Sequence, residues 1–117
     1  SCYGSSGATS INPATGTPYF RAFPQVTTRD MARAHTLLRK ELGIEKILIG
    51  LGGSMGGQQL LEWAILEPTL FETIIPMATN AKHSPWGIAF NESQRLALEA
   101  DATFFEDRLD AGLAGLK

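Results

Sequence analysis

The chain has 117 residues, of which 44% are hydrophobic, and a formal net charge of -2 at pH 7. This composition fits one modest globular core and excludes a disordered or fibrous chain. Lys and Arg are scattered among Asp and Glu without a basic stripe, so we expect no nucleic-acid partner. There is no apolar run of membrane-spanning length, no secretory signal pattern and no cysteine besides Cys2. We therefore expect no membrane contact, no internal disulfide and a cytoplasmic location.

The first part of the chain is predicted to be one long loop. Residues 1–26 are rich in Ser, Gly, Thr and Pro and show neither a helical nor an alternating period. Loops of this length without secondary structure are uncommon inside a compact domain. Together with a first residue, Ser1, that is not methionine, this loop indicates a chain taken from something larger.

A helix is predicted next. Thr27 and Asp30 have the spacing of a capping box, and Gly43 has the position of a helix stop. Between them lies an apolar stripe at helical spacing, which we expect to face the core: Met31, Ala34, Leu38 and Leu42.

The rest of the chain alternates strands and helices. Ile47–Ile49 is a short aliphatic run typical of a strand buried on both faces of a parallel sheet. A helix is predicted over Gln58–Glu67. It should end before Pro68, because a proline disfavours the helical conformation in the residue that precedes it. Phe71–Met77 is predicted to be a second strand and Pro85–Ala100 a third helix. Two strands leave both sheet edges open, so the sheet must continue beyond this chain or be completed by a partner.

The motif that carries chemistry is G-x-S-x-G, formed by Gly52, Ser54 and Gly56 between a predicted strand and a predicted helix. A sharp turn there would raise the Ser54 hydroxyl above the sheet as a nucleophile, with the backbone N–H of Met55 as an oxyanion donor. Small neighbours are needed for such a turn to close, and four glycines provide them: Gly52, Gly53, Gly56 and Gly57. A plain glycine-rich turn is the other interpretation. A dinucleotide-binding loop is disfavoured, because Met55 stands where its fingerprint requires glycine.

Several motifs in register resemble the homoserine O-acetyltransferases. The sequence GGSMGG with the following LEWA is similar to the nucleophile turn and helix of that family. The same family order is seen in SINPATGTPY, FPQVTTRDM, LGIEK and HSPWGIAFNESQR. The resemblance covers most of the chain and is far more specific than the G-x-S-x-G motif alone.

This resemblance implies a partial α/β-hydrolase fold in which parallel strands, helices and a strand–serine–helix nucleophile elbow belong to one domain. Residues 1–117 would be a fragment of it, with a loop at 1–26, a core with the elbow at 27–83 and the start of a lid region at 84–117. The implied reaction, part of methionine biosynthesis, moves an acetyl group from acetyl-CoA to the hydroxyl of L-homoserine through an acyl-serine. Acetyl-CoA would be a substrate, with no bound cofactor or metal, and the intact enzyme would be a homodimer.

The chain also departs from a complete active site. The fold orders its triad as Ser, then an acid, then His, and the family's acid and histidine lie beyond this sequence. His35 and His83 are expected to be ordinary loop or helix-surface residues, so the fragment should be inactive alone. Asn91 and Arg95 are candidate substrate contacts on the lid helix, although a solvated helix face explains them better. An esterase, another serine or homoserine acyltransferase, and a non-catalytic self-associating subdomain remain alternatives.

Overall fold

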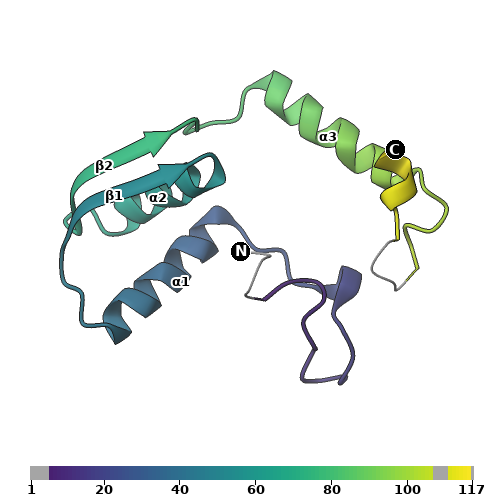
Figure 1. Ribbon diagram of the computed structural model, residues 1–117, viewed down its shortest axis with the longest axis horizontal. Helices are drawn as coiled ribbons and strands as arrows, with labels where there is room; N and C mark the ends of the chain where they lie inside the picture. Colours follow the sequence, from purple (N-terminus) through teal and green to yellow (C-terminus); the bar gives the residue numbers. More distant parts are fainter. Residues whose placement is uncertain (1–5, 107–110, 117) are drawn as a thin grey trace. The chain divides into compact units, whose positions relative to one another are not determined.

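The computed structural model describes residues 6–106 and 111–116 (Figure 1). Its elements follow in the order η1 (Phe20–Ala22), α1 (Thr28–Glu41), β1 (Ile47–Gly53), α2 (Met55–Leu66), β2 (Phe71–Met77), α3 (Pro85–Glu99) and η2 (Leu113–Leu116). Ser1 and Cys2 lie outside the described residues. Within the described part of the chain, every helix is too short or too polar to span a bilayer.

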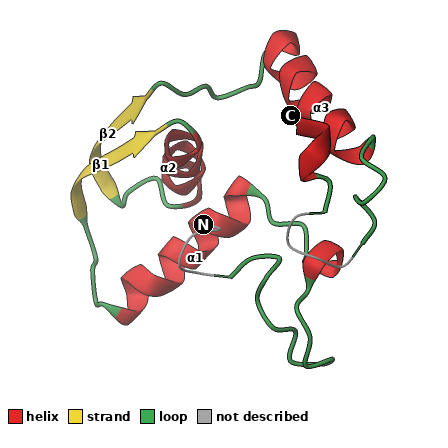
Figure 2. Ribbon diagram, turned by 45° about the vertical axis from the view of Figure 1, so that its right-hand side comes forward, coloured by secondary structure: helices red, strands yellow, loops and turns green. Residues whose placement is uncertain are grey.

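Contacts divide the chain into two compact units. One is Val26–His83, which contains α1, β1, α2 and β2, and the other combines the chain segments before and after it. In the first unit β1 and β2 pair in parallel, with a register running from Ile47↔Phe71 to Gly53↔Met77. Helix α2 lies against the strand pair and α1 packs on α2 (Figures 1 and 2). The predicted alternation of helices with parallel strands is confirmed.

Local signals explain where α1 begins and ends. The Thr27 hydroxyl accepts a hydrogen bond from Asp30 N at 3.2 Å, and Asp30 Oδ2 accepts one from Thr27 N at 3.0 Å, which completes the capping box. Gly43 has a φ of +66° just beyond the helix, a conformation that other residues reach only with strain. The predicted start and stop of this helix are both confirmed.

The apolar stripe predicted on α1 does not form the face that packs on α2, so this prediction is wrong. Leu38 and Leu42 are 58% and 63% exposed. The face that meets α2 carries Ala32, which is fully buried, and His35, whose ring lies 5.3 Å from that of Trp63. Polar side chains on α1 reach partners on α2, so a hydrophobic count along one helix could not identify this face.

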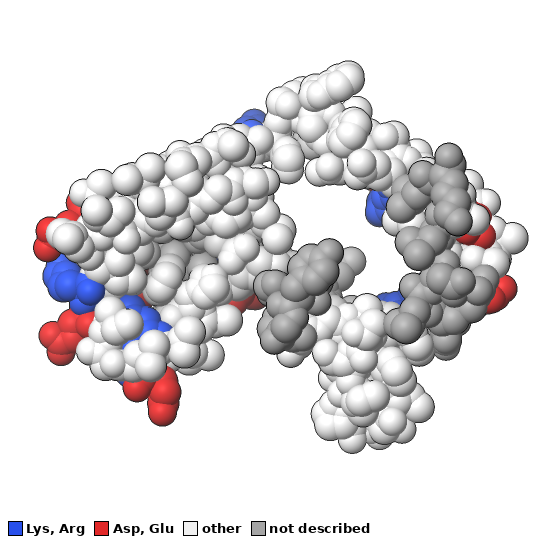
Figure 3. All heavy atoms as spheres, in the orientation of Figure 1, with Lys and Arg blue, Asp and Glu red and all other residues white. Residues whose placement is uncertain are grey.

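The predicted strand Ile47–Ile49 is too short and its burial is wrong. β1 continues to Gly53 because its backbone stays paired with β2 through the glycines. Leu48 and Ile49 are 66% and 53% exposed, because the described chain supplies two strands and one adjacent helix layer. Figure 3 shows mostly uncharged atoms over the strands, with charged side chains gathered toward α1.

The small core of this unit lies between α2 and its neighbours. Leu60 and Leu70 are 6% and 4% exposed. Trp63 and Phe71 are half-buried and meet edge to face with ring centroids 5.2 Å apart. The helix that carries Trp63 starts at Met55, three residues before the predicted Gln58, directly after Ser54.

The second unit consists of the segments before Val26 and after His83. Before Val26 the predicted loop contains η1 and a single bridge between Ile11 and Pro18. The Arg21 guanidinium lies over the ring of Phe105, 4.5 Å from its centroid, and 5.5 Å from that of Phe104. Helix α3 follows the predicted bounds within a residue and starts at the Ser84 cap, although none of its side chains is buried.

Candidate active site

Ser54 occupies a strained turn between β1 and α2. Its φ is 52° and its ψ is -123°, a combination that costs a non-glycine residue free energy unless the surroundings impose it. Ser54 N donates to Met77 O at 2.9 Å, so the turn is tied to the end of β2. The chain therefore passes abruptly from strand to helix at the serine, as the G-x-S-x-G motif predicted.

The Ser54 hydroxyl is not used to cap its helix. Thr27 and Ser84 stand at the same position before α1 and α3, and each accepts a hydrogen bond from a backbone N–H of the first turn. Ser54 makes no such bond, and within residues 6–106 and 111–116 its hydroxyl has no hydrogen-bond partner. Ser54 is also an exposed residue in the described structure.

The first turn of α2 provides polar backbone around the serine. Met55 is the first residue of α2, where a backbone N–H has no acceptor within the helix. A helix N-terminus also favours negative charge. This supports the assignment of the Met55 N–H as an oxyanion donor, which remains a prediction.

The four glycines of the elbow are not equivalent. A Cβ added to Gly52 would lie 2.5 Å from the backbone oxygen of Gly56, and one added to Gly57 would lie 2.6 Å from Thr79 Cγ2. At Gly53 and Gly56 an added Cβ meets nothing within 4 Å in the described structure. Close approach therefore requires glycine at Gly52 and Gly57 in this structure, whereas the expected structural role of Gly53 and Gly56 remains a prediction.

Thr79 is a site residue that sequence reasoning missed. Its Oγ1 donates to Ser54 O at 2.7 Å, and that oxygen also accepts from Gly57 N at 2.9 Å and Gln58 N at 3.3 Å. The available signal was position alone, because Thr79 follows a strand predicted to run parallel to the strand that ends at the elbow.

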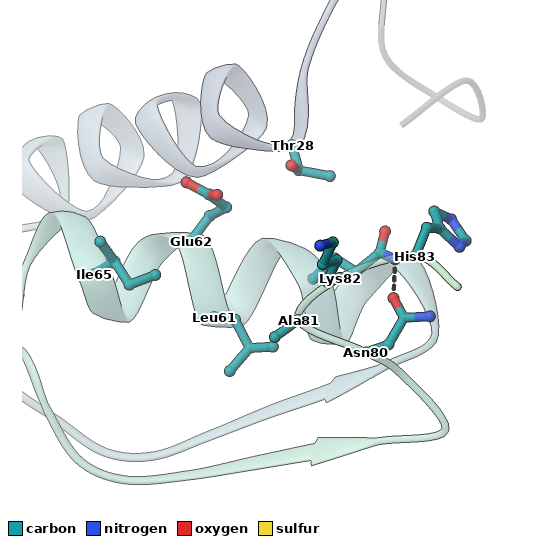
Figure 4. Close-up of a pocket in the computed structure, with 9 residues that line it drawn as sticks. Thr28, Leu61, Glu62, Ile65, Asn80, Ala81, Lys82 and His83 are labelled. Atoms are coloured by element: carbon teal, nitrogen blue, oxygen red, sulfur yellow. Dashed lines mark hydrogen bonds between the residues drawn. The ribbon is translucent and has the colours of Figure 1, made fainter. Parts of the chain in front are cut away.

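In the described structure the two histidines have surroundings of their own, apart from Ser54. His35 Nε2 lies 3.0 Å from Gln59 Oε1, within the α1–α2 interface. His83 lines a groove of about 360 Å³ along α2, together with Thr28, Glu62 and Lys82 (Figure 4). Neither of the two histidines hydrogen-bonds to the serine in the described structure. The expectation that the triad histidine lies beyond this sequence remains a prediction.

The candidate substrate contacts lie on α3, in the other unit. Asn91 is exposed. The Arg95 guanidinium binds the Glu92 carboxylate through two hydrogen bonds, Nε–Oε2 at 3.1 Å and Nη2–Oε1 at 2.5 Å. The hydrogen bond to Glu92 raises the pKa of Arg95 above its usual value. Both residues keep their predicted role as a hypothesis only.

The architecture and the elbow define a class. Parallel strands, covering helices and a positive-φ serine between strand and helix form part of an α/β-hydrolase fold. Solved structures agree: esterase E22 has a TM-score of 0.80 and 34% identity, covering 94% of this chain and 32% of its own. The homoserine O-acetyltransferase from Bacillus anthracis has a TM-score of 0.82 and 30% identity, covering 92% and 30%.

Sequence comparison finds similar proteins within that class. The homoserine O-acetyltransferase of Trichormus variabilis is 52% identical over 101 residues, which are 86% of this chain and 28% of the relative. That of Cyclobacterium marinum is 50% identical over 117 residues, 100% of this chain and 33% of the relative. No family model matches the chain. The chain is thus related to the homoserine O-acetyltransferases, as its motifs predicted, and spans about a third of the length of these relatives.

Proposed function

We propose that the whole protein transfers an acetyl group from acetyl-CoA to the hydroxyl of L-homoserine through an acyl-Ser54 intermediate. The observation that carries this proposal is the exposed Ser54 hydroxyl, held in a strained turn and left out of helix capping. Relatives named homoserine O-acetyltransferase support the choice of reaction.

The reaction has two half-reactions. In the first, Ser54 Oγ attacks the thioester carbonyl, its proton passes to a base, and the C–S bond breaks to release CoA with a protonated thiol. In the second, the homoserine hydroxyl attacks the acyl-serine, loses its proton to the same base, and Ser54 leaves with its hydroxyl restored. The oxyanion formed in each half-reaction would accept a hydrogen bond from Met55 N–H.

The remaining expectations belong to this proposal. Because the acid and base of the triad lie outside the described residues, residues 1–117 alone should be nearly inactive. Asn91 and Arg95 would contact a substrate, for which the Arg95 guanidinium must also be able to leave Glu92. We further propose a cytoplasmic homodimer that binds no metal or cofactor besides its substrates, with no nucleic-acid or membrane partner.

The test is to trap the acyl-enzyme in the whole protein. Incubation with labelled acetyl-CoA should place one acetyl group on the peptide that contains Ser54, detected by mass spectrometry, and release a burst of CoA. Ser54→Ala should abolish both signals. Ser93→Ala is the matched control, since the hydroxyl of that exposed serine donates to the Phe90 carbonyl oxygen of its own helix in the described structure. Acetylation that persists in Ser54→Ala would disprove the assignment of the nucleophile.

Ester hydrolysis is the second candidate function, and the likeness to esterase E22 at 34% identity favours it. The elbow serves both reactions, because they differ only in what attacks the acyl-serine. Competition among acceptors separates them. Added L-homoserine should accelerate deacylation and yield its acetyl ester if the protein is a transferase, L-serine should compete poorly, and deacylation should be insensitive to both if water is the natural acceptor.

A further inference from the structure

The turn at the end of β2 is hydrogen-bonded to the elbow at the end of the neighbouring strand β1. This β2 turn, residues 77–80, makes three hydrogen bonds to the elbow and its helix. Ser54 N donates to Met77 O at 2.9 Å, Thr79 Oγ1 donates to Ser54 O at 2.7 Å, and Gln58 Nε2 donates to Asn80 Oδ1 at 3.0 Å. Both peptide groups that adjoin the Ser54 Cα are therefore fixed to the same turn.

The β2 turn is itself strained. Ala78 has a φ of 46°, close to the 52° of Ser54, and these are two of the three non-glycine residues with positive φ in the described chain. Each follows the last paired residue of its strand, Gly53 or Met77. Left-handed backbone at an alanine costs about 1 kcal/mol or more and persists only where other contacts impose it. Ala78 lies between Met77 and Thr79, and the hydrogen bonds of these two neighbours with Ser54 tie the two turns together.

Thr79 has its side chain fixed on two sides. Its methyl group and Cβ lie so close to Gly57 that an added Cβ there would be 2.6 Å and 2.7 Å from them. Its hydroxyl points to the Ser54 carbonyl. Threonine has few χ1 rotamers, so packing of the methyl group against α2 aims the hydroxyl.

We propose that Thr79 is a positioning residue for the Ser54 nucleophile. Its hydroxyl holds the Ser54 carbonyl, and with the N–H bond to Met77 it sets the direction in which the Ser54 side chain leaves the turn. The inference rests on the proposed function, since it matters only if Ser54 is acylated. A displacement of the order of 1 Å at a reacting group can reduce the rate about 100-fold, so a hydrogen bond to the backbone of the reacting residue can control it.

The experiment uses three variants of the whole protein. Thr79→Val keeps the shape and removes the hydroxyl, while Thr79→Ser keeps the hydroxyl and removes the methyl group. Thr73→Val is the matched control, because this exposed threonine of β2 makes no hydrogen bond through its side chain in the described structure. The probe is p-nitrophenyl acetate, whose burst of p-nitrophenolate reports acylation, together with kcat and KM for acetyl transfer.

Thr79→Val should slow acylation and kcat by about 10- to 100-fold with little change in KM. Thr79→Ser should remain within a few fold of the parent, and Thr73→Val should match it. The proposal is overturned if Thr79→Val acylates at the parent rate, or if Thr79→Ser is as slow as Thr79→Val, because the methyl packing would then be what matters. A burst that survives in Ser54→Ala overturns the proposed function as well, whereas a burst that needs Ser54 but ignores Thr79 overturns this inference alone.

Discussion

The guanidinium of Arg39 and the carboxylate of Glu67 join α1 to α2, with Nη2 and Oε1 2.6 Å apart and both side chains largely buried. Arg39 Nη1 also donates to Ile44 O at 2.6 Å, which ties the end of α1 to the loop before β1. The other Glu67 oxygen, Oε2, accepts from Trp63 Nε1 at 2.7 Å and Thr36 Oγ1 at 3.1 Å. One carboxylate therefore organises the helix pair behind the elbow.

Replacement of Glu67 by glutamine should reduce stability in a way that depends on pH. The hydrogen bond from Arg39, helped by those from Trp63 and Thr36, holds the pKa of Glu67 below its ordinary value of 4.5, against the opposing effect of burial. Because the pKa is lower in the folded state, the stabilisation is complete above pH 4.5 and is lost as pH falls through the folded-state value. We expect Glu67→Gln to lower the free energy of unfolding by about 1 to 2 kcal/mol at neutral pH.

Urea unfolding of the whole protein at pH 7 and at steps down to about pH 3 measures this difference. The difference in unfolding free energy between the parent and Glu67→Gln should become smaller below pH 4.5, as the Glu67 carboxylate of the parent becomes protonated. Glu45→Gln is the control, because this exposed carboxylate has no ion pair in the described chain. A constant difference at all pH values would mean that the ionisation of Glu67 does not stabilise the helix pair.

Two adjacent glycines of the elbow should respond oppositely to alanine. Gly52→Ala places a Cβ 2.5 Å from the backbone oxygen of Gly56, and backbone cannot yield as a flexible side chain does. We expect a loss of about 1 to 3 kcal/mol and reduced acylation of Ser54. Gly53→Ala meets nothing within 4 Å and should be neutral or slightly stabilising. Thermal unfolding and the acylation burst report both effects, and equal losses in the two variants would contradict the steric argument.

The capping box should be worth a measurable part of the stability of α1. Thr27→Ala removes the acceptor for Asp30 N and should cost about 1 kcal/mol. Thr28→Ala changes the next residue, whose hydroxyl takes no part in the box, and should cost much less. Chemical denaturation of both variants checks the prediction. If Thr28→Ala proves as costly, the effect comes from the loss of threonine on the helix surface and not from capping.

His35 should matter for packing and not for proton transfer. Its ring lies beside Trp63 and its Nε2 beside Gln59 Oε1, so His35→Leu should cost about 1 kcal/mol. The pH dependence of acyl transfer should be unchanged, because the contacts of His35 are with Gln59 and Trp63 and not with Ser54 in the described structure. A shifted pH–rate profile in this variant would give His35 a catalytic role and contradict the assignment.

Features with a local cause could be predicted from the sequence. The capping box of Thr27 and the stop at Gly43 depend on a few neighbouring residues, and so does the elbow around Ser54. The extent of β1 could not be predicted, because glycines at 50, 52 and 53 weaken a strand pattern and only pairing with β2 keeps them extended. The exposure of Leu48 could not be predicted either. It depends on how many strands and helices cover β1, and the hydrophobic pattern of one strand does not contain that information.

In the candidate site, too, locally determined features could be predicted and features that depend on distant residues could not. Ser54 was found from its motif, whereas Thr79 depends on which strand lies beside β1 and where its turn begins. The packing face of α1 was missed for a related reason. It is made by His35 and Arg39, whose partners Gln59 and Glu67 are more than twenty residues away in sequence.

The contact of Arg21 with Phe105 closes a loop of chain that contains the whole of Val26–His83. Helices and the adjacent parallel strand pair can form through nearer contacts, whereas this cation–π pair must bring together residues separated by most of the described sequence. Closure of so long a loop carries an entropic cost before the contact returns any energy, which slows folding. The elbow unit should therefore acquire hydrogen-exchange protection first, and the segments that flank it should become protected in a later kinetic phase.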